Sequence, residues 1–185
     1  VVGCASESNV IGMVGGYAIP GVNRLMKAFM EGSRETNPEV TCLVNFISSW
    51  YDQPKAKESA FEMMDAGADV MYAERFGVSD AAVERGAKAI GNVIDTSADY
   101  PGTILASALW HMEATVDTAI AAVAAGSYAA QAYGQYSYMA PGGGSLAMDE
   151  ALVSADGVAA VKAQEAAIMA GSDDIHVNDA APVSV

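Results

Sequence analysis

Hydrophobic residues along the chain fall into short continuous runs that alternate with amphipathic stretches. Apolar runs of strand length occupy residues 10–16, 40–46, 69–73, 87–93 and 103–109. After the first run, apolar residues recur at the spacing of one helical face, at Val22, Leu25, Met26 and Phe29. Continuous apolar strands are typical of a parallel sheet that is covered on both faces. The alternation of strand and helix therefore predicts an α/β fold, with a parallel sheet between two layers of helices.

Capping residues indicate where further helices begin. Asp52 is placed to cap a helix over residues 53–67, which tolerates Pro54 in its first turn. Ser79 is expected to cap a short helix in the same way. The run at 40–46 is interpreted as a fully buried strand. These signals predict that a strand end and a helix start meet at Asp52, directly after two aromatic residues.

The second half of the chain has weaker patterns. A helix is expected over residues 110–125, and a last helix over about 156–170. Residues 130–139 alternate with period 2, which is typical of a strand. Asp173 and Asp174, in the polar tail behind the last helix, are interpreted as solvated charges.

The composition indicates a folded and strongly acidic protein. Hydrophobic residues make up 52% of the chain and charged residues 17%, which allows a substantial core and argues against disorder. The formal net charge of −14 would repel a nucleic-acid backbone, so we expect no nucleic-acid partner. The apolar runs are all much shorter than a membrane-spanning helix.

Aromatic and charged residues gather where the predicted strands end. These positions include Tyr17, Trp50 and Tyr51, Glu74 to Gly77, and Trp110. Ligand sites of open parallel sheets lie beyond the carboxyl ends of the strands. The set suits a flat, partly polar ligand held between rings, with hydrogen bonds from charged groups at its edge. The alternative for each aromatic is that it only seals the sheet end or a domain contact. Because both tryptophans of the chain fall at strand ends, the group as a whole favours a binding site.

Enzyme and metal signatures are weak. The chain lacks the GxGxxG fingerprint and the phosphate loop GxxxxGK[ST]. Ser145 lies in a near miss to the nucleophile elbow, GGSLA, but the stretch PGGGS at 141–145 is better interpreted as a flexible turn. His111 and Glu113 form an H-x-E pair, but no P-C-x-x-C follows it. We therefore predict a binding protein that needs no metal or cofactor.

Several motifs in order resemble one family. They are IGMVGG followed by VNRLMKAFMEG, then NPEVTCLVNFISSWYDQPKAKE, AGADVMYAE, AIGNVID and TILASALWHMEATVDTAI. The chain is similar, from Val2 almost to its end, to the second half of basic-membrane-protein-like (BMP) proteins. These are substrate-binding components of ABC transporters, typically for purine nucleosides. The last helix and an expected strand at Ile175–Val177 resemble the carboxyl terminus of the family.

The resemblance implies a type I periplasmic-binding fold, in which the ligand lies in a cleft between two lobes. Residues 1–106 would form the α/β core of the second lobe, and residues 107–127 a crossover helix that packs on a first lobe missing from this chain. Residues 128–185 would supply return strands, the last helix and the tail. The partners implied are a small-molecule purine, the missing first lobe and an ABC permease in the membrane. The implied location is the periplasm, either free or as a membrane-anchored lipoprotein.

The family's site residues transfer to named positions of this chain. Its base-stacking aromatic falls on Trp50. Its ligand-closing loop falls on Glu74, Arg75, Phe76 and Gly77. Tyr17, at the first strand end, is expected to join them.

Two departures from the family concern the sugar. Nucleoside binders that this chain resembles hold the ribose with an acidic residue and a lysine, and the matching positions here are Val93 and Trp110. Asp95 could replace the acid only with a shift in register. An uncharged site would leave sugar hydroxyls poorly paired, so the ligand is expected to be a free purine base, adenine or a relative of it. The alternatives are a purine nucleoside, a ligand-sensing receptor module of the same fold, and a nucleoside-processing enzyme.

Overall fold

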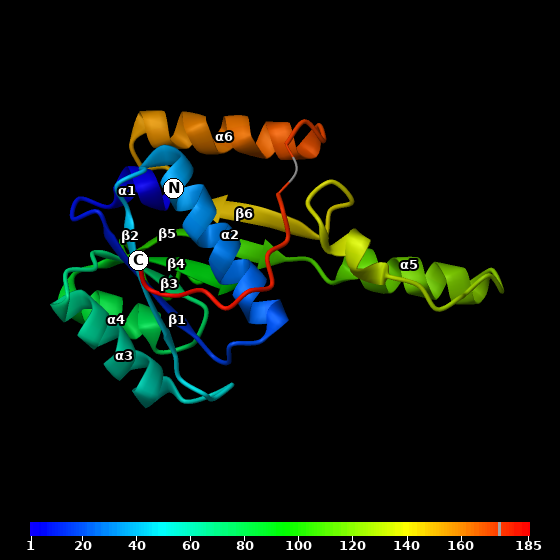
Figure 1. Cartoon of the computed structure of the whole chain (residues 1–185). Helices are drawn as coiled ribbons and strands as arrows, with labels where there is room; N and C mark the ends of the chain where they lie inside the picture. The colour runs from blue at the N-terminus through cyan, green and yellow to red at the C-terminus, as the bar shows by residue number, and fades with distance from the viewer. Residues whose placement is uncertain (174) are drawn as a thin grey trace.

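Six strands form one sheet in the order β2-β1-β3-β4-β5-β6 in the computed structural model of the protein (Figure 1). The structure describes residues 1–173 and 175–185. The strands are β1 (Val10–Gly15), β2 (Thr41–Phe46), β3 (Val70–Ala73), β4 (Lys88–Val93), β5 (Ile104–Trp110) and β6 (Gly144–Met148). The first five are parallel, and β6 runs antiparallel to β5. The predicted α/β fold with a mostly parallel sheet is confirmed.

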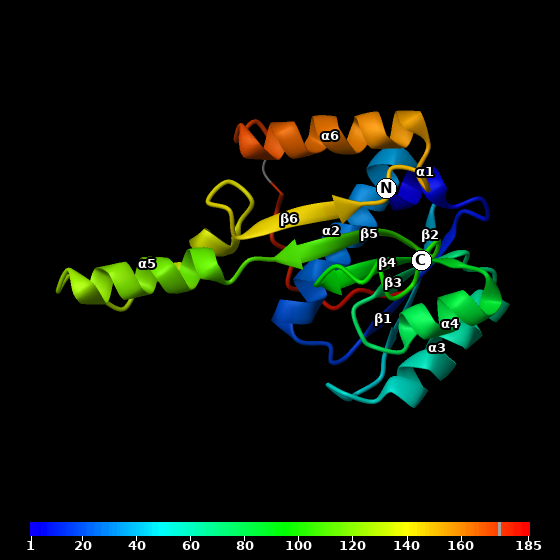
Figure 2. The same cartoon turned by 180° about the vertical axis from the view of Figure 1, so that it is seen from behind.

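Helices cover the sheet on both faces, as Figures 1 and 2 show from opposite sides. One face packs against α1 (Val2–Ala5), α2 (Pro20–Thr36) and α6 (Ala155–Met169), and the other against α3 (Gln53–Asp65) and α4 (Val78–Arg85). Alternate residues of β1 serve the two layers, because successive side chains of a strand point to opposite faces. Met13 packs in the layer of α2, and Val14 packs in the layer of α3 and α4.

The segment after β5 leaves the body of the molecule. It contains α5 (Glu113–Ala124) and the 3-10 helix η1 (Tyr133–Ser137), which project beyond the sheet as an arm (Figures 1 and 2). None of the residues of α5 is buried. Its exposed apolar residues include Val116, Ile120 and Val123. Each of the helices in the described ranges is too short or too polar to cross a membrane.

The last residues of the chain cover the open edge of the sheet. The tail crosses α2, where Asp179 accepts a hydrogen bond from Arg24 at 2.9 Å. Its final residue, Val185, then exchanges two backbone hydrogen bonds with Cys42 of β2, of 2.8 and 3.0 Å. This pairing protects part of an edge strand that would otherwise present free backbone groups.

Five local predictions differ from the structure. β2 is an edge strand with Thr41 and Asn45 exposed, so the run at 40–46 is not fully buried. Residues 130–139 form no strand, because β6 occupies the place beside β5 and the segment folds into η1. The helix expected from residue 110 begins at Glu113, since β5 continues to Trp110. No strand forms at 175–177, and Asp174 lies outside the described residues.

The fifth difference concerns the start of α4. The residue that precedes the helix is Gly77, with φ of 100°, whereas Ser79 lies buried inside the first turn. A Cβ at residue 77 would overlap the carbonyl oxygen of Gln53, so the close approach of α3 and α4 requires glycine there. At α3 the prediction is confirmed: Oδ1 of Asp52 accepts a hydrogen bond from the backbone N–H of Lys55 at 3.1 Å.

Candidate functional site

The loops after β1, β2 and β3 meet at the carboxyl edge of the sheet. Backbone hydrogen bonds continue the pairing of β1 and β2 past their ends, from Ile47 to Gly15 and from Ser48 to Gly16. The turn at Ser48 has φ of 55°, which directs the chain back across the end of β1. As a result Trp50, which follows β2, lies over Gly16. A Cβ on Gly16 would stand 3.2 Å from the Trp50 ring, so the glycine lets the ring settle there.

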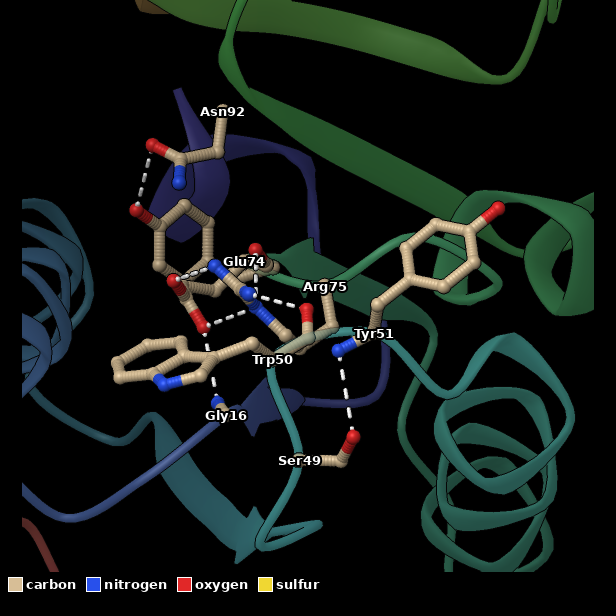
Figure 3. Close-up of polar contacts among 8 residues, drawn as sticks. Gly16, Ser49, Trp50, Tyr51, Glu74, Arg75 and Asn92 are labelled. Carbon is tan, nitrogen blue, oxygen red and sulfur yellow. Dashed lines mark hydrogen bonds and ion pairs between the residues drawn. The ribbon is translucent and has the colours of Figure 1, made fainter.

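A buried carboxylate organises this edge. Glu74 follows β3, and its side chain is only 3% exposed. Its Oε2 accepts hydrogen bonds from the backbone N–H of Gly16 at 3.0 Å and from Nε of Arg75 at 2.8 Å (Figure 3). Its Oε1 accepts a further bond from Nη2 of Arg75 at 2.5 Å. Both carboxylate oxygens are therefore occupied, and the paired charges are compensated despite their burial.

Arg75 joins this pair to Trp50. Its Nη1 donates to the backbone carbonyl of Trp50 at 2.8 Å, and its guanidinium carbon lies 5.4 Å from the centre of the Trp50 ring. That distance is typical of a cation–π contact. Tyr17 lies on the ring as well, with centroids 4.9 Å apart and planes tilted by 54°. Trp50 is nevertheless 51% exposed, so a fixed aromatic surface remains open at the sheet edge.

Tyr51 and Phe76 form a separate aromatic pair. Their ring centres are 6.5 Å apart in an edge-on arrangement, and both side chains are exposed. In Figure 3 the Tyr51 ring points away from Trp50. Of the loop 74–77, the structure thus brings Glu74 and Arg75 to Trp50, while Phe76 lies beside Tyr51.

The remaining predicted residues, Trp110 and Asp95, lie on the β4–β5 side. Trp110 ends β5 and is 47% exposed, and among the described residues no aromatic ring stacks on it. Asp95 accepts a hydrogen bond from the backbone N–H of Ser97 at 2.9 Å, and this bond lowers the pKa of its carboxyl group. The loop carries Asp95 toward Ala106 and Met148, where it lines a small hollow of about 220 Å³ on the face of the sheet. Within the described ranges, neither residue forms a hydrogen bond, ion pair or ring contact with Trp50, Glu74 or Arg75.

Val93, at the end of β4, has strained backbone. Its φ is 73°, a left-handed value that β-branched residues rarely adopt. The side chain is 39% exposed, and its neighbour Ile94 is more exposed still. This side of the edge therefore presents apolar side chains from Val93, Ile94 and Trp110.

One pair of site residues was missed in the sequence. The hydroxyl group of Tyr72, on β3, donates to Oδ1 of Asn92, on β4, at 3.2 Å (Figure 3). Tyr72 is buried and stacks on Phe29 of α2, with ring centres 4.6 Å apart. Burial and, second, the negative charge of Glu74 raise the pKa of the Tyr72 phenol, which therefore stays protonated. The two residues are neighbours only through the strand register. Tyr72 pairs with Ile90, and Asn92 lies two residues further along β4, on the same face of the sheet.

Two residues of the weak enzyme motifs also meet. Nε2 of His111 lies 2.6 Å from Oγ of Ser145, which joins the ends of β5 and β6. No carboxylate of the described residues hydrogen-bonds His111 as the third member of a catalytic triad would. We therefore interpret this hydrogen bond as a structural contact between β5 and β6. The described residues also contain no group of three or more His, Cys, Asp or Glu side chains suited to a metal.

Comparisons with known proteins agree with this architecture. A putative ABC transporter glucose-binding protein of Haloferax volcanii is 40% identical over 73 residues, which are 40% of this chain and 19% of that protein. A purine-binding protein of Brucella abortus is 28% identical over 102 residues, or 54% of this chain and 29% of that protein. The matched parts are therefore less than a third of either relative.

Solved structures share the fold. A solute-binding protein of an ABC transporter system from Conexibacter woesei superposes with a TM-score of 0.72 at 22% identity, over 96% of this chain and 60% of that one. A transcriptional activator of the comK gene from Bacillus halodurans superposes with a TM-score of 0.77 at 21% identity, over 95% and 62%. The family model for PnrA-like substrate-binding proteins of ABC transporters, Bmp, matches residues 1–138. The chain therefore belongs to the Bmp family.

Proposed function

We propose that this chain forms one lobe of a substrate-binding protein that delivers a purine nucleobase to an ABC transporter. The observation that carries the proposal is the half-exposed ring of Trp50 at the carboxyl edge of the sheet, held by Arg75 and Tyr17. A flat ring fixed in this way suits stacking on a planar base. The family match and the relative named as purine-binding support the same ligand class.

The base is favoured over its nucleoside by the apolar side of the edge. Val93 and Trp110 are exposed there, and neither can hydrogen-bond a sugar hydroxyl with a charged side chain. A ribose placed against them would lose hydrogen bonds to water without replacement. An aromatic or apolar surface instead gains free energy when it covers the rest of a base.

A sugar is the second candidate ligand, because one relative is named as glucose-binding. Sugar hydroxyls require both donors and acceptors from the protein. The carboxylate of Glu74, which pairs with Arg75 beside Trp50, is buried and has both oxygens engaged. Glu74 is therefore a poor acceptor for sugar hydroxyls, which favours the purine.

The exposed helix α5 of the arm suggests how the first lobe and the permease would bind. The apolar side chains of Val116, Ile120 and Val123 on α5 are 47%, 61% and 63% exposed. We propose that they pack on a first lobe, which would close over the Trp50 edge and complete the cleft. The closed protein would then dock on a membrane permease. The site at Asp95 stays a prediction, since its carboxylate lies on the face of the sheet.

Calorimetric titration of the purified protein tests the ligand. The panel is adenine, guanine, adenosine, guanosine and glucose, and we expect heat of binding from a base at lower concentration than from its nucleoside. Adenosine binding tighter than adenine, with guanosine tighter than guanine, would overturn the nucleobase proposal. Heat from glucose alone would replace the purine with the sugar.

A further inference from the structure

The Tyr72–Asn92 pair lies beside the proposed base-stacking surface. The Trp50 ring rests over the end of β1 and against Arg75, which follows β3. Asn92 is on β4, which pairs directly with β3. Adjacent strands are about 4.8 Å apart, so Asn92 lies about two strand spacings from the end of β1. A base that extends from Trp50 toward β4 would therefore bring its edge to the Asn92 amide. Figure 3 shows Asn92 and Trp50 on either side of the Glu74–Arg75 pair.

The orientation of the Asn92 amide is determined by Tyr72. The buried Tyr72 hydroxyl group has Oδ1 of Asn92 as its acceptor, and the described residues supply no other acceptor for it. Rotating the amide by half a turn would place an NH₂ group against the hydroxyl and leave the buried O–H donor without a partner. Since burial and the charge of Glu74 keep the phenol protonated, with a raised pKa, the donor role of Tyr72 is permanent.

The amide nitrogen of Asn92 is left free for a ligand. Among the described residues Nδ2 has no hydrogen-bond partner, and the Asn92 residue is only partly buried. Arg75 likewise retains N–H groups beyond those that it donates to Glu74 and Trp50. Both oxygens of Glu74 already accept hydrogen bonds within the protein. The unused polar groups of Arg75 and Asn92 are N–H donors.

We infer that Asn92 is a specificity-determining residue that donates its amide N–H to the carbonyl oxygen of a 6-oxopurine. The inference rests on the proposed function and narrows the ligand from a purine base to a 6-oxopurine. This ligand differs from the adenine-like base that the sequence predicts. Adenine carries an amino group at the same position, and that group would set a donor against the Asn92 donor. A site built to donate discriminates against such a ligand because the buried groups remain unpaired.

Titration of the purified protein with hypoxanthine and adenine tests the inference. We expect wild type to bind hypoxanthine about tenfold more tightly than adenine, the equivalent of one hydrogen bond. Tyr72→Phe keeps the ring but removes the hydroxyl group, so the amide can turn and present Oδ1 to adenine. The ratio of the two affinities should then fall to within about threefold. Asn92→Leu should weaken hypoxanthine by about tenfold and leave adenine nearly unchanged.

Tyr100→Phe is the matched control. Its hydroxyl group donates to Asp80 of α4 at 3.2 Å, on the side of the sheet away from α2, so the affinity ratio should not change. Adenine binding as tightly as hypoxanthine in wild type, or an unchanged ratio in both Tyr72→Phe and Asn92→Leu, overturns this inference and leaves the nucleobase proposal standing. Absence of heat from every purine base overturns both.

Discussion

The two sides of the carboxyl edge are built in opposite ways. At β1–β3, Glu74 and Arg75 use most of their hydrogen-bonding capacity within the protein and hold Trp50 in place. At β4–β5, Trp110 and Val93 are exposed, and Val93 has a strained backbone. The first side is fixed by contacts within the protein, whereas the second exposes apolar side chains. Under the proposed function, a base stacks on the first side, and Asn92 of β4 donates a hydrogen bond to its edge. Val93 and Trp110 would then contact the rest of the base or the first lobe.

Removing the carboxylate of Glu74 should damage the first side most. Glu74→Ala leaves the guanidinium group of Arg75, 20% exposed, without its partner and the N–H of Gly16 without an acceptor. We expect the free energy of unfolding to fall by about 3 kcal/mol, as for broken buried pairs. Urea unfolding measures it, with Asp65→Ala as control. Asp65 pairs with Arg85 on the surface, so its loss should cost less than about 1 kcal/mol. Equal losses in the two variants would contradict the claim that Glu74 stabilises this side of the edge.

Gly77→Ala should have the next largest effect. The new Cβ would collide with the carbonyl oxygen of Gln53 in a backbone conformation, φ of 100°, that favours glycine. We expect a loss of about 2–3 kcal/mol in unfolding free energy. Gly86→Ala is the control, because residue 86 also has positive φ, of 69°, but open space around it. It should cost only about 1 kcal/mol. A smaller loss at residue 77 than at residue 86 would show that the contact of α3 with the loop is not tight.

Trp50→Ala should weaken binding of the purine base by about 2 kcal/mol, the usual contribution of stacking on an aromatic side chain. Tyr51→Ala provides the control, since its exposed ring points away from Trp50 and its loss should leave the affinity within about twofold (Figure 3). Calorimetry measures both variants. If Tyr51→Ala loses more affinity than Trp50→Ala, the ligand lies on the other aromatic pair.

The smallest expected effect is a gain in stability on the strained side. Val93→Asn replaces a β-branched residue at φ of 73° with one that tolerates the left-handed region. The side chain is already 39% exposed, so little burial is lost. We expect about 1 kcal/mol of added stability in thermal unfolding. The neighbouring Ile94→Asn should give no gain, and a gain of the same size there would mean that strain at Val93 is not the cause.

The sequence predicts the central fold well because its signals are local. The five parallel strands fall on mainly apolar runs, and Asp52 caps α3 through its own side chain. β6 has only five residues, all of intermediate burial, and carries no comparable pattern. The period-2 stretch at 130–139 was misleading, because a strand also needs a neighbouring edge, and β6 already occupies the one beside β5.

Less of the candidate site was predictable. The positions of Trp50, Glu74 and Arg75 at strand ends follow from the pattern of strands. That Glu74 would turn its carboxylate to Arg75 and Gly16 depends on how three loops meet, which no local signal contains. The Tyr72–Asn92 bond depends in the same way on the register of β3 and β4.

The central claim is that a base stacks on Trp50, and the tryptophan fluorescence of the protein tests it most directly. The chain has two tryptophans, so in a Trp110→Phe variant Trp50 is the single remaining tryptophan of this chain. We predict that a purine base quenches its emission in a saturable way, at concentrations well below those at which the matching nucleoside acts. Emission that stays unchanged while calorimetry reports saturation with the base would contradict stacking on Trp50.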